Sequence, residues 1–204
     1  MKNTRYLAAL AAFLLIGALA TDAAAKGKRA PTKPGTYTDW NGDLDRIEIV
    51  QTFSLDDFEG LLVGAFETED VVLPDPDDNS YEPAVRVLAD VESPLIQGLR
   101  KELSRLKVKR ADGEPAAGDL LLRGRVVEMD PGSRAARYWG GFGAGAARAK
   151  ISGEVVDGGS GEVLLRFTQE RRSGVGVGGG NYVNLMNRSL RAIGKDLGVG
   201  LEQF

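Results

Sequence analysis

The sequence predicts an α+β fold, in which a mostly antiparallel sheet of about five strands carries helices packed on it within a single domain. Three observations lead to this prediction. Apolar residues recur at spacings of three and four in two segments, which is typical of amphipathic helices. They alternate with period two in several other segments, and the turn formers at 157–161 join two of those segments into a hairpin.

The first 25 residues are expected to be a cleaved signal peptide. Lys2 and Arg5 precede an uncharged apolar run, 7–20, which is too short to span a bilayer comfortably. Alanines at 23–25 provide the small residues that a signal peptidase reads, and an uncleaved membrane anchor is the alternative. We therefore expect an exported protein, periplasmic or peripherally associated with the outer membrane, with no transmembrane span in its mature chain.

The mature chain is expected to begin with an extended or disordered arm at 26–43, which is rich in basic and turn-forming residues. The α+β domain then covers 44–204. Two strands are predicted at 45–51 and 60–67, because the first alternates and the second is densely apolar. An acidic, proline-containing loop at 70–80 follows them.

A helix is predicted next, over residues 94–106. Ser93 is placed to cap it and Pro94 to occupy its first position, where proline is tolerated. The apolar residues that share one helical face here are Val85, Leu88, Val91, Leu95, Leu99, Leu103 and Leu106.

The second half of the chain alternates with period two. Strands are predicted at 119–129, 147–157 and 162–170, and the last two form the hairpin. Asn181 is placed to cap a final helix. The residues on the buried face of that helix are Tyr182, Met186, Leu190, Ile193 and Leu197.

Composition excludes several classes of chemistry. The chain contains no histidine and no cysteine, which rules out Ser-His-Asp and Cys-His catalysis, thiol redox chemistry and the usual zinc sites. We expect no metal and no cofactor. A formal net charge of −3 gives no indication of nucleic-acid binding.

A candidate interaction loop combines arginines and large aromatic side chains beside a glycine-dense run. Its residues are Arg134, Arg137, Tyr138, Trp139 and Phe142. Arginine and aromatic residues are enriched in protein interfaces. The alternative is that Trp139 and Phe142 close one end of the core, and the sequence leaves both open.

The same loop carries a resemblance to a known family. The run DPGSRAARYWGGFGAGA at 130–146 and the run VDGGSGEVL at 156–164 resemble the signature of a bacterial envelope family, the domain of unknown function DUF4410. The resemblance extends from about Ile47 to the C-terminus. It implies export, and many members are lipoproteins with a cysteine after the signal, where this chain has Lys26. It implies no activity and no catalytic residues.

These observations favour an exported, non-catalytic cell-envelope protein. It would act through contacts with an envelope protein partner or through self-assembly as a homo-oligomer, using the candidate loop and exposed strand edges. Two alternatives remain open. One is a small binding module for an anion or a carbohydrate, and the other is a hydrolase built on paired carboxylates.

Overall fold

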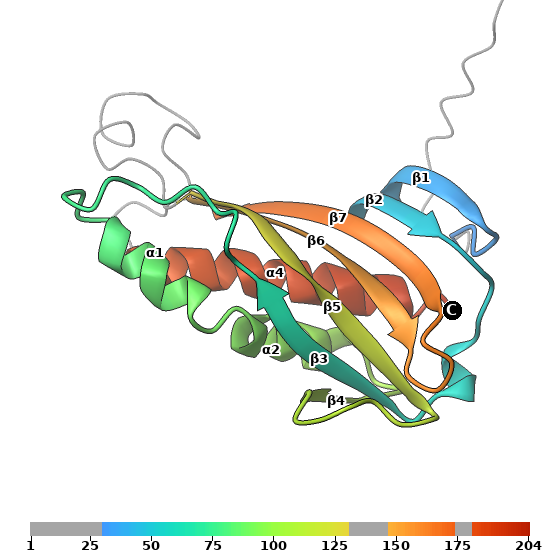
Figure 1. Ribbon diagram of the computed structural model, residues 1–204. Coiled ribbons are helices and arrows are strands. Elements are labelled where there is room, and N and C mark those ends of the chain that lie inside the picture. Colours follow the sequence, from blue (N-terminus) through green and yellow to red (C-terminus); the bar gives the residue numbers. More distant parts are fainter. Residues whose placement is uncertain (1–29, 131–146, 174–180) are drawn as a thin grey trace, which may run out of the picture.

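A curved sheet with helices on one side makes up the fold (Figure 1). The computed structural model describes residues 30–130, 147–173 and 181–204. The strands within these residues are β1 (Gly35–Trp40), β2 (Leu44–Ile49), β3 (Gly60–Glu67), β4 (Lys107–Arg110), β5 (Asp119–Asp130), β6 (Ala147–Asp157) and β7 (Val163–Ser173). The helices are α1 (Tyr81–Leu88), α2 (Glu92–Glu102) and α4 (Tyr182–Leu201), with a single 3-10 turn at Leu55–Asp57.

The sheet is mixed, with the strand order β1-β2-β7-β6-β5-β3-β4. Neighbours from β1 to β5 are antiparallel, whereas β3 is parallel to both β4 and β5. The predicted α+β class is confirmed, but the prediction of a mostly antiparallel sheet of about five strands is wrong. The reason lies between β3 and β4, where α1 and α2 form a crossover that returns the chain in the same direction.

The predicted hairpin is confirmed as β6 and β7. Its turn is held by the Asp157 carboxylate, which accepts hydrogen bonds from the amides of Gly159 at 2.7 Å and Ser160 at 3.1 Å. Gly161 has a φ of 75°, in the left-handed region that favours glycine. The turn formers therefore act as the sequence predicts.

Two strands, β1 and β4, have too weak a sequence signal to be predicted. β1 lies inside the segment expected to be an arm, so the sheet begins before residue 44. Its anchor is Trp40, which is 2% exposed and donates a hydrogen bond from its indole nitrogen to the Pro31 carbonyl at 3.0 Å. The Trp40 ring also stacks on Phe204 with centroids 5.8 Å apart. One buried aromatic thus orders a segment that has little apolar alternation of its own.

The boundaries of α2 differ from the prediction. The helix begins at Glu92 instead of Pro94, and Ser93 is inside it, so Ser93 is not its cap. It ends at Glu102, because Leu103 adopts an extended backbone. Leu103 and Leu106 are nevertheless buried, as the helical spacing suggested. At the start of α4 the predicted cap is confirmed, since the side chain of Asn181 accepts a hydrogen bond from the Val183 amide at 2.9 Å.

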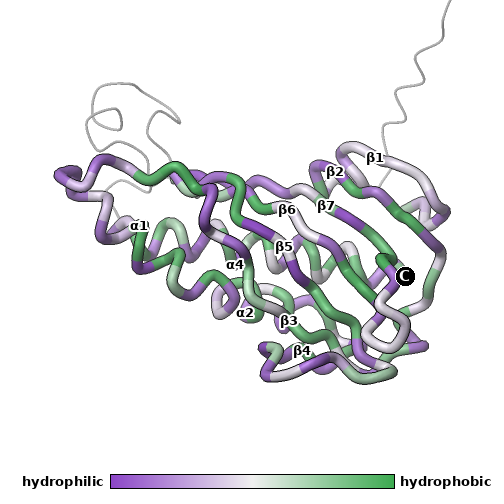
Figure 2. Tube along the Cα trace, viewed as in Figure 1, coloured by the Kyte–Doolittle hydropathy of each residue, from purple (hydrophilic) through white to green (hydrophobic). Residues whose placement is uncertain are grey.

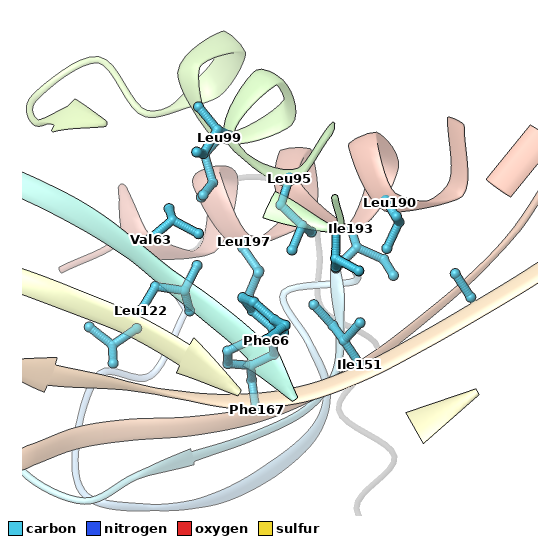
Figure 3. Packing of buried hydrophobic residues seen from close by; sticks show 14 of the residues in the cluster. Val63, Phe66, Leu95, Leu99, Leu122, Ile151, Phe167, Leu190, Ile193 and Leu197 are labelled. Atoms are coloured by element: carbon cyan, nitrogen blue, oxygen red, sulfur yellow. The ribbon is translucent and has the colours of Figure 1, made fainter. Parts of the chain in front are cut away.

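The core lies between the sheet and the helices. Apolar and polar residues alternate along the strands in Figure 2, and the apolar ones face α2 and α4. Figure 3 shows this packing from close by. The labelled core residues are Val63, Phe66, Leu95, Leu99, Leu122, Ile151, Phe167, Leu190, Ile193 and Leu197.

A glycine contact sets the distance between α2 and α4. A Cβ atom on Gly98 would lie 2.7 Å from the amide nitrogen of Lys195, and one on Gly194 would lie 3.0 Å from the carbonyl carbon of Leu95. Real Cβ atoms do not approach backbone this closely. The two helices therefore pack backbone against backbone on the inner side of the sheet.

Candidate functional site

The predicted interaction loop lies outside the described residues. Arg134, Arg137, Tyr138, Trp139 and Phe142 all fall within 131–146, between the end of β5 and the start of β6. Whether Trp139 and Phe142 form an interface or close the core stays a prediction.

The structure directs attention instead to the open face of the sheet, opposite the helices. A shallow groove of about 490 Å³ crosses this face from β3 to β2. Its lining residues are Arg46, Glu48, Ala65, Glu67, Arg123, Gly124, Arg125, Ser152, Gly153, Glu154, Arg166, Phe167 and Thr168. Apart from Ala65 and Phe167, the side chains that line it are charged or carry a hydroxyl.

Two glycines lie side by side within the groove. Gly124 on β5 is in register with Gly153 on β6. On the helix side, a Cβ on Gly153 would lie 2.9 Å from the Phe167 ring, and one on Gly124 would lie 3.1 Å from the Phe66 ring. The two rings therefore pack against the glycines from the helix side of the sheet, and they separate the groove from the core.

One row of charged side chains crosses the groove and is fully paired. Arg123 contacts Glu154 at 2.8 Å, and Glu154 also contacts Arg166 at 3.5 Å. Arg166 in turn contacts Glu48 at 3.5 Å. The four residues are in register across β5, β6, β7 and β2, so positive and negative charges alternate along the row. We call these four residues the paired row.

The neighbouring row, two residues along each strand, has a different composition. Arg125 is in register with Ser152, Ser152 with Thr168, and Thr168 with Arg46. Both arginines are exposed, and neither forms an ion pair with any described residue. We call these four residues the arginine row. It places one arginine at each side of the groove, with two hydroxyl groups between them.

A second groove, of about 430 Å³, lies near the β6–β7 turn. Phe53 and Phe58 line it, and their rings meet edge to face with centroids 6.4 Å apart. Phe204 stacks on Phe53 at 4.5 Å. Asp157 also lines this groove, but its carboxylate already accepts the hydrogen bonds that shape the turn. The Asp157 carboxylate and the aromatic rings therefore have structural roles in this groove.

Polar groups on the helix side form a buried network between the sheet and α4. The Gln169 side chain, 0% exposed, accepts a hydrogen bond from the Asp45 amide at 2.8 Å and donates to Asp196 at 3.0 Å. Arg171 contacts the same carboxylate of Asp196 at 2.6 Å. Burial raises the pKa of Asp196, and the hydrogen bonds from Arg171 and Gln169 offset that effect only in part. Gln169 and Arg171 both contact the Asp196 carboxylate, so these three side chains stabilise the packing of α4 on the sheet.

The Glu92 carboxylate plays a comparable role at the other end of the helix layer. It is 8% exposed and accepts a hydrogen bond from the Phe66 amide at 2.8 Å, next to the irregularity in β3. It also contacts Arg110 at 3.1 Å. The carboxylate thus satisfies a backbone donor that the interrupted ladder leaves free.

The described residues contain no group of three or more acidic side chains placed to hold a metal ion. Within the same ranges, no helix has the length and apolar character needed to cross a bilayer.

Comparison with known families supports the resemblance read from the two glycine-containing runs. Residues 74–177 match the model of the family described as "Domain of unknown function (DUF4410)". The chain belongs to this family. The match in this DUF4410 chain includes three of the four arginine-row residues, Arg125, Ser152 and Thr168, whereas Arg46 precedes it.

No curated protein matches the chain. Among solved structures, the PelC dodecamer from Paraburkholderia phytofirmans is 14% identical, with 74% of this chain and 96% of that chain covered and a TM-score of 0.44. A Xanthomonas campestris protein of family DUF330 is 15% identical, with 72% and 85% covered and a TM-score of 0.40. These likenesses carry no functional argument for this chain.

The sequence did carry a signal for the arginine row, but an incomplete one. Arg123 and Arg125 sit at alternate positions of a predicted strand, which places them on one face. What the sequence does not show is that Arg46, on β2, lies beside Thr168 on β7. That neighbour relation joins segments more than a hundred residues apart and creates the groove.

Proposed function

We infer that the chain is an exported, non-catalytic cell-envelope protein that acts through contacts with an envelope partner or with further copies of itself. The observation that supports action through contacts with other chains is the difference between the two edges of the sheet. An edge strand offers unpaired backbone groups to another chain unless it is short, charged or covered.

The β4 edge is protected in this way. It has four residues, and Lys107, Lys109 and Arg110 are three of them. β1 has six residues, of which Asp39 is the only charged one. Among the described strands, β1 is therefore the edge suited to strand addition by another chain.

The test of self-assembly is the solution mass across a concentration series. Thr36 on β1 lies opposite Glu48 of β2, so Thr36→Lys adds an edge charge beside an acidic neighbour and leaves the fold intact. Ala89→Lys, at the exposed end of α1, is the matched control. We expect a defined oligomer for the natural chain and for Ala89→Lys, and a smaller mass for Thr36→Lys. A monomer at every concentration would contradict self-assembly. Contact with a different envelope protein would then be the remaining form of the proposal.

Export needs its own test. The full chain with a C-terminal epitope is expressed in a Gram-negative host and the cells are fractionated. We expect a product that begins at Lys26, in the periplasmic or outer-membrane fraction. An uncleaved product in the cytoplasm would contradict export, and an uncleaved product in the inner membrane would indicate the anchor alternative.

A further inference from the structure

We propose that the groove on the open face binds a small ligand with two oxyanion groups, each held by one arginine of the arginine row. This site is separate from the β1 edge and does not depend on the function inferred above. Arg125 and Arg46 are three strands apart, so their backbones are separated by roughly 14 Å, and both residues line the groove.

The acidic residues in the rows on either side of the arginine row have cationic partners of their own. On one side lies the paired row, in which Glu154 contacts Arg123 and Glu48 contacts Arg166. On the other side, Glu128 contacts Arg148 at 2.9 Å, and Glu170 contacts Arg172 at 2.9 Å. The acids of both flanking rows therefore already have cationic partners and do not neutralise the arginine row.

One acid does adjoin the row. Glu67 on β3 is in register with Arg125, but the structure gives them no ion pair. Arg46 is bordered instead by Thr168 on β7 and Thr38 on β1, which are neutral. The lining of the whole groove contains four arginines and three glutamates, so it keeps one net positive charge, and a groove concentrates the potential of such a charge.

The side chains of the arginine row are suited to binding oxyanions. A guanidinium presents a planar fork of N–H groups that fits a carboxylate or a phosphate with two parallel hydrogen bonds. The hydroxyls of Ser152 and Thr168, which lie between the arginines, can donate to or accept from the middle of the same ligand. The row therefore has hydrogen-bond donors for oxyanions at its two ends. At its centre it has hydroxyl groups that can either donate or accept a hydrogen bond.

The groove has the size and polarity of a site for a small molecule. A groove of about 490 Å³ is within the range of small-molecule sites, roughly 300–1,000 Å³. The core of a protein interface is enriched in aromatic side chains. The aromatic residue lining this groove, Phe167, is 3% exposed and belongs to the core. The groove therefore suits a small polar ligand better than a protein surface.

The test uses calorimetric titration at constant ionic strength, with citrate as the carboxylate probe and pyrophosphate as the phosphate probe. The protein is expressed as the full chain and is purified with or without its N-terminal segment, according to whether the cells cleave that segment. Arg46→Gln and Arg125→Gln each remove one guanidinium that forms no ion pair with a residue in 30–130, 147–173 or 181–204. Arg86→Gln, on the exposed surface of α1, makes the same change in charge elsewhere and is the matched control.

We expect saturable binding of at least one probe at a single site. Each groove variant should weaken it by about tenfold or more, because a hydrogen bond to a charged group is lost. Arg86→Gln should bind the probe as tightly as the natural chain does. All three variants should have the melting temperature of the natural chain. The probe that binds more tightly identifies the oxyanion as carboxylate or phosphate. Absence of saturable binding for both probes, or equal weakening by Arg86→Gln, would overturn the proposal.

Discussion

The two faces of the sheet differ in how their side chains are stabilised. On the helix side, buried apolar side chains pack against one another (Figure 3), and α2 and α4 meet at close glycine contacts. On the open face, charged side chains stand in cross-strand rows and remain partly exposed. The period-two alternation of the strands sorts residues between these faces. The inner face therefore determines the fold, whereas the side chains of the open face are not needed to form the core.

The polar contacts of the two faces differ in the same way. Gln169 is fully buried, so a lost partner would leave donors and acceptors without water. Arg123 and Arg166 are about half exposed, with side-chain exposures of 53% and 48%. Water and salt screen such pairs, which contribute little to stability. Mutations on the two faces should therefore differ in their effect on stability.

The largest effect is expected at the contact between α2 and α4. Gly98→Ala would place a Cβ 2.7 Å from the backbone nitrogen of Lys195, and neither helix can move without opening the core. We expect a loss of about 3 kcal/mol or more in the free energy of unfolding, measured by urea denaturation. Gly113→Ala is the matched control, because nothing lies within 4 Å of its added Cβ. Equal stability of both variants would contradict the close packing of these helices.

The next largest effect is expected for the buried network. Gln169→Leu removes the acceptor of the Asp45 amide and one donor to Asp196, so we expect a loss of about 2 kcal/mol in the free energy of unfolding. Gln97→Leu, on the exposed side of α2, is the control and should change stability little. If the two variants unfold at the same denaturant concentration, the network does not contribute to stability.

A smaller, pH-dependent effect is expected at Glu202, beside the end of α4. Burial would raise its pKa, but the amides of Ser104 and Arg105 and the Arg105 side chain donate hydrogen bonds that outweigh burial, so the pKa is lowered from 4.5. The stabilisation is therefore present above the unfolded pKa and is lost as pH falls through the lower, folded pKa.

Glu202→Gln should accordingly be less stable than the natural chain at pH 7, by about 1 kcal/mol or less, and the two should converge as pH falls below 4.5. Urea denaturation at a series of pH values from 7 to 3 measures this. Glu69→Gln, in an exposed loop, removes the same charge without those hydrogen bonds and serves as the control. A constant difference between Glu202→Gln and the natural chain at every pH would contradict the shifted pKa.

Local patterns predicted the inner face well. The strands at 60–67 and 147–157 have the predicted bounds, and Asn181 caps the last helix as expected. These features depend on residues close together in the chain, where periodicity and capping chemistry act directly. The predicted C-terminal boundary of α2 was wrong, because Leu103 and Leu106 continue the apolar spacing after the helix has ended.

The open face was predictable only in part. Alternation shows that Arg123 and Arg125 share a face, but it does not show which strand lies beside which. The arginine row depends on β2 pairing with β7, and the mixed sheet depends on the crossover between β3 and β4. Both are long-range contacts, whose partners a single sequence does not specify. The loop at 131–146, where the sequence placed its candidate residues, lies outside the described part of the chain.

The smallest effect is expected for the paired row, and it tests the comparison most directly. A double-mutant cycle with Arg123→Gln and Glu154→Gln measures the coupling of a pair whose atoms are 2.8 Å apart. Because Arg123 is half exposed, we expect a coupling energy below about 1 kcal/mol, measured by urea denaturation at low and high salt. A coupling above about 2 kcal/mol that persists in high salt would show that the open face also stabilises the fold. A value near zero would mean that this face can be altered for binding without loss of the folded state.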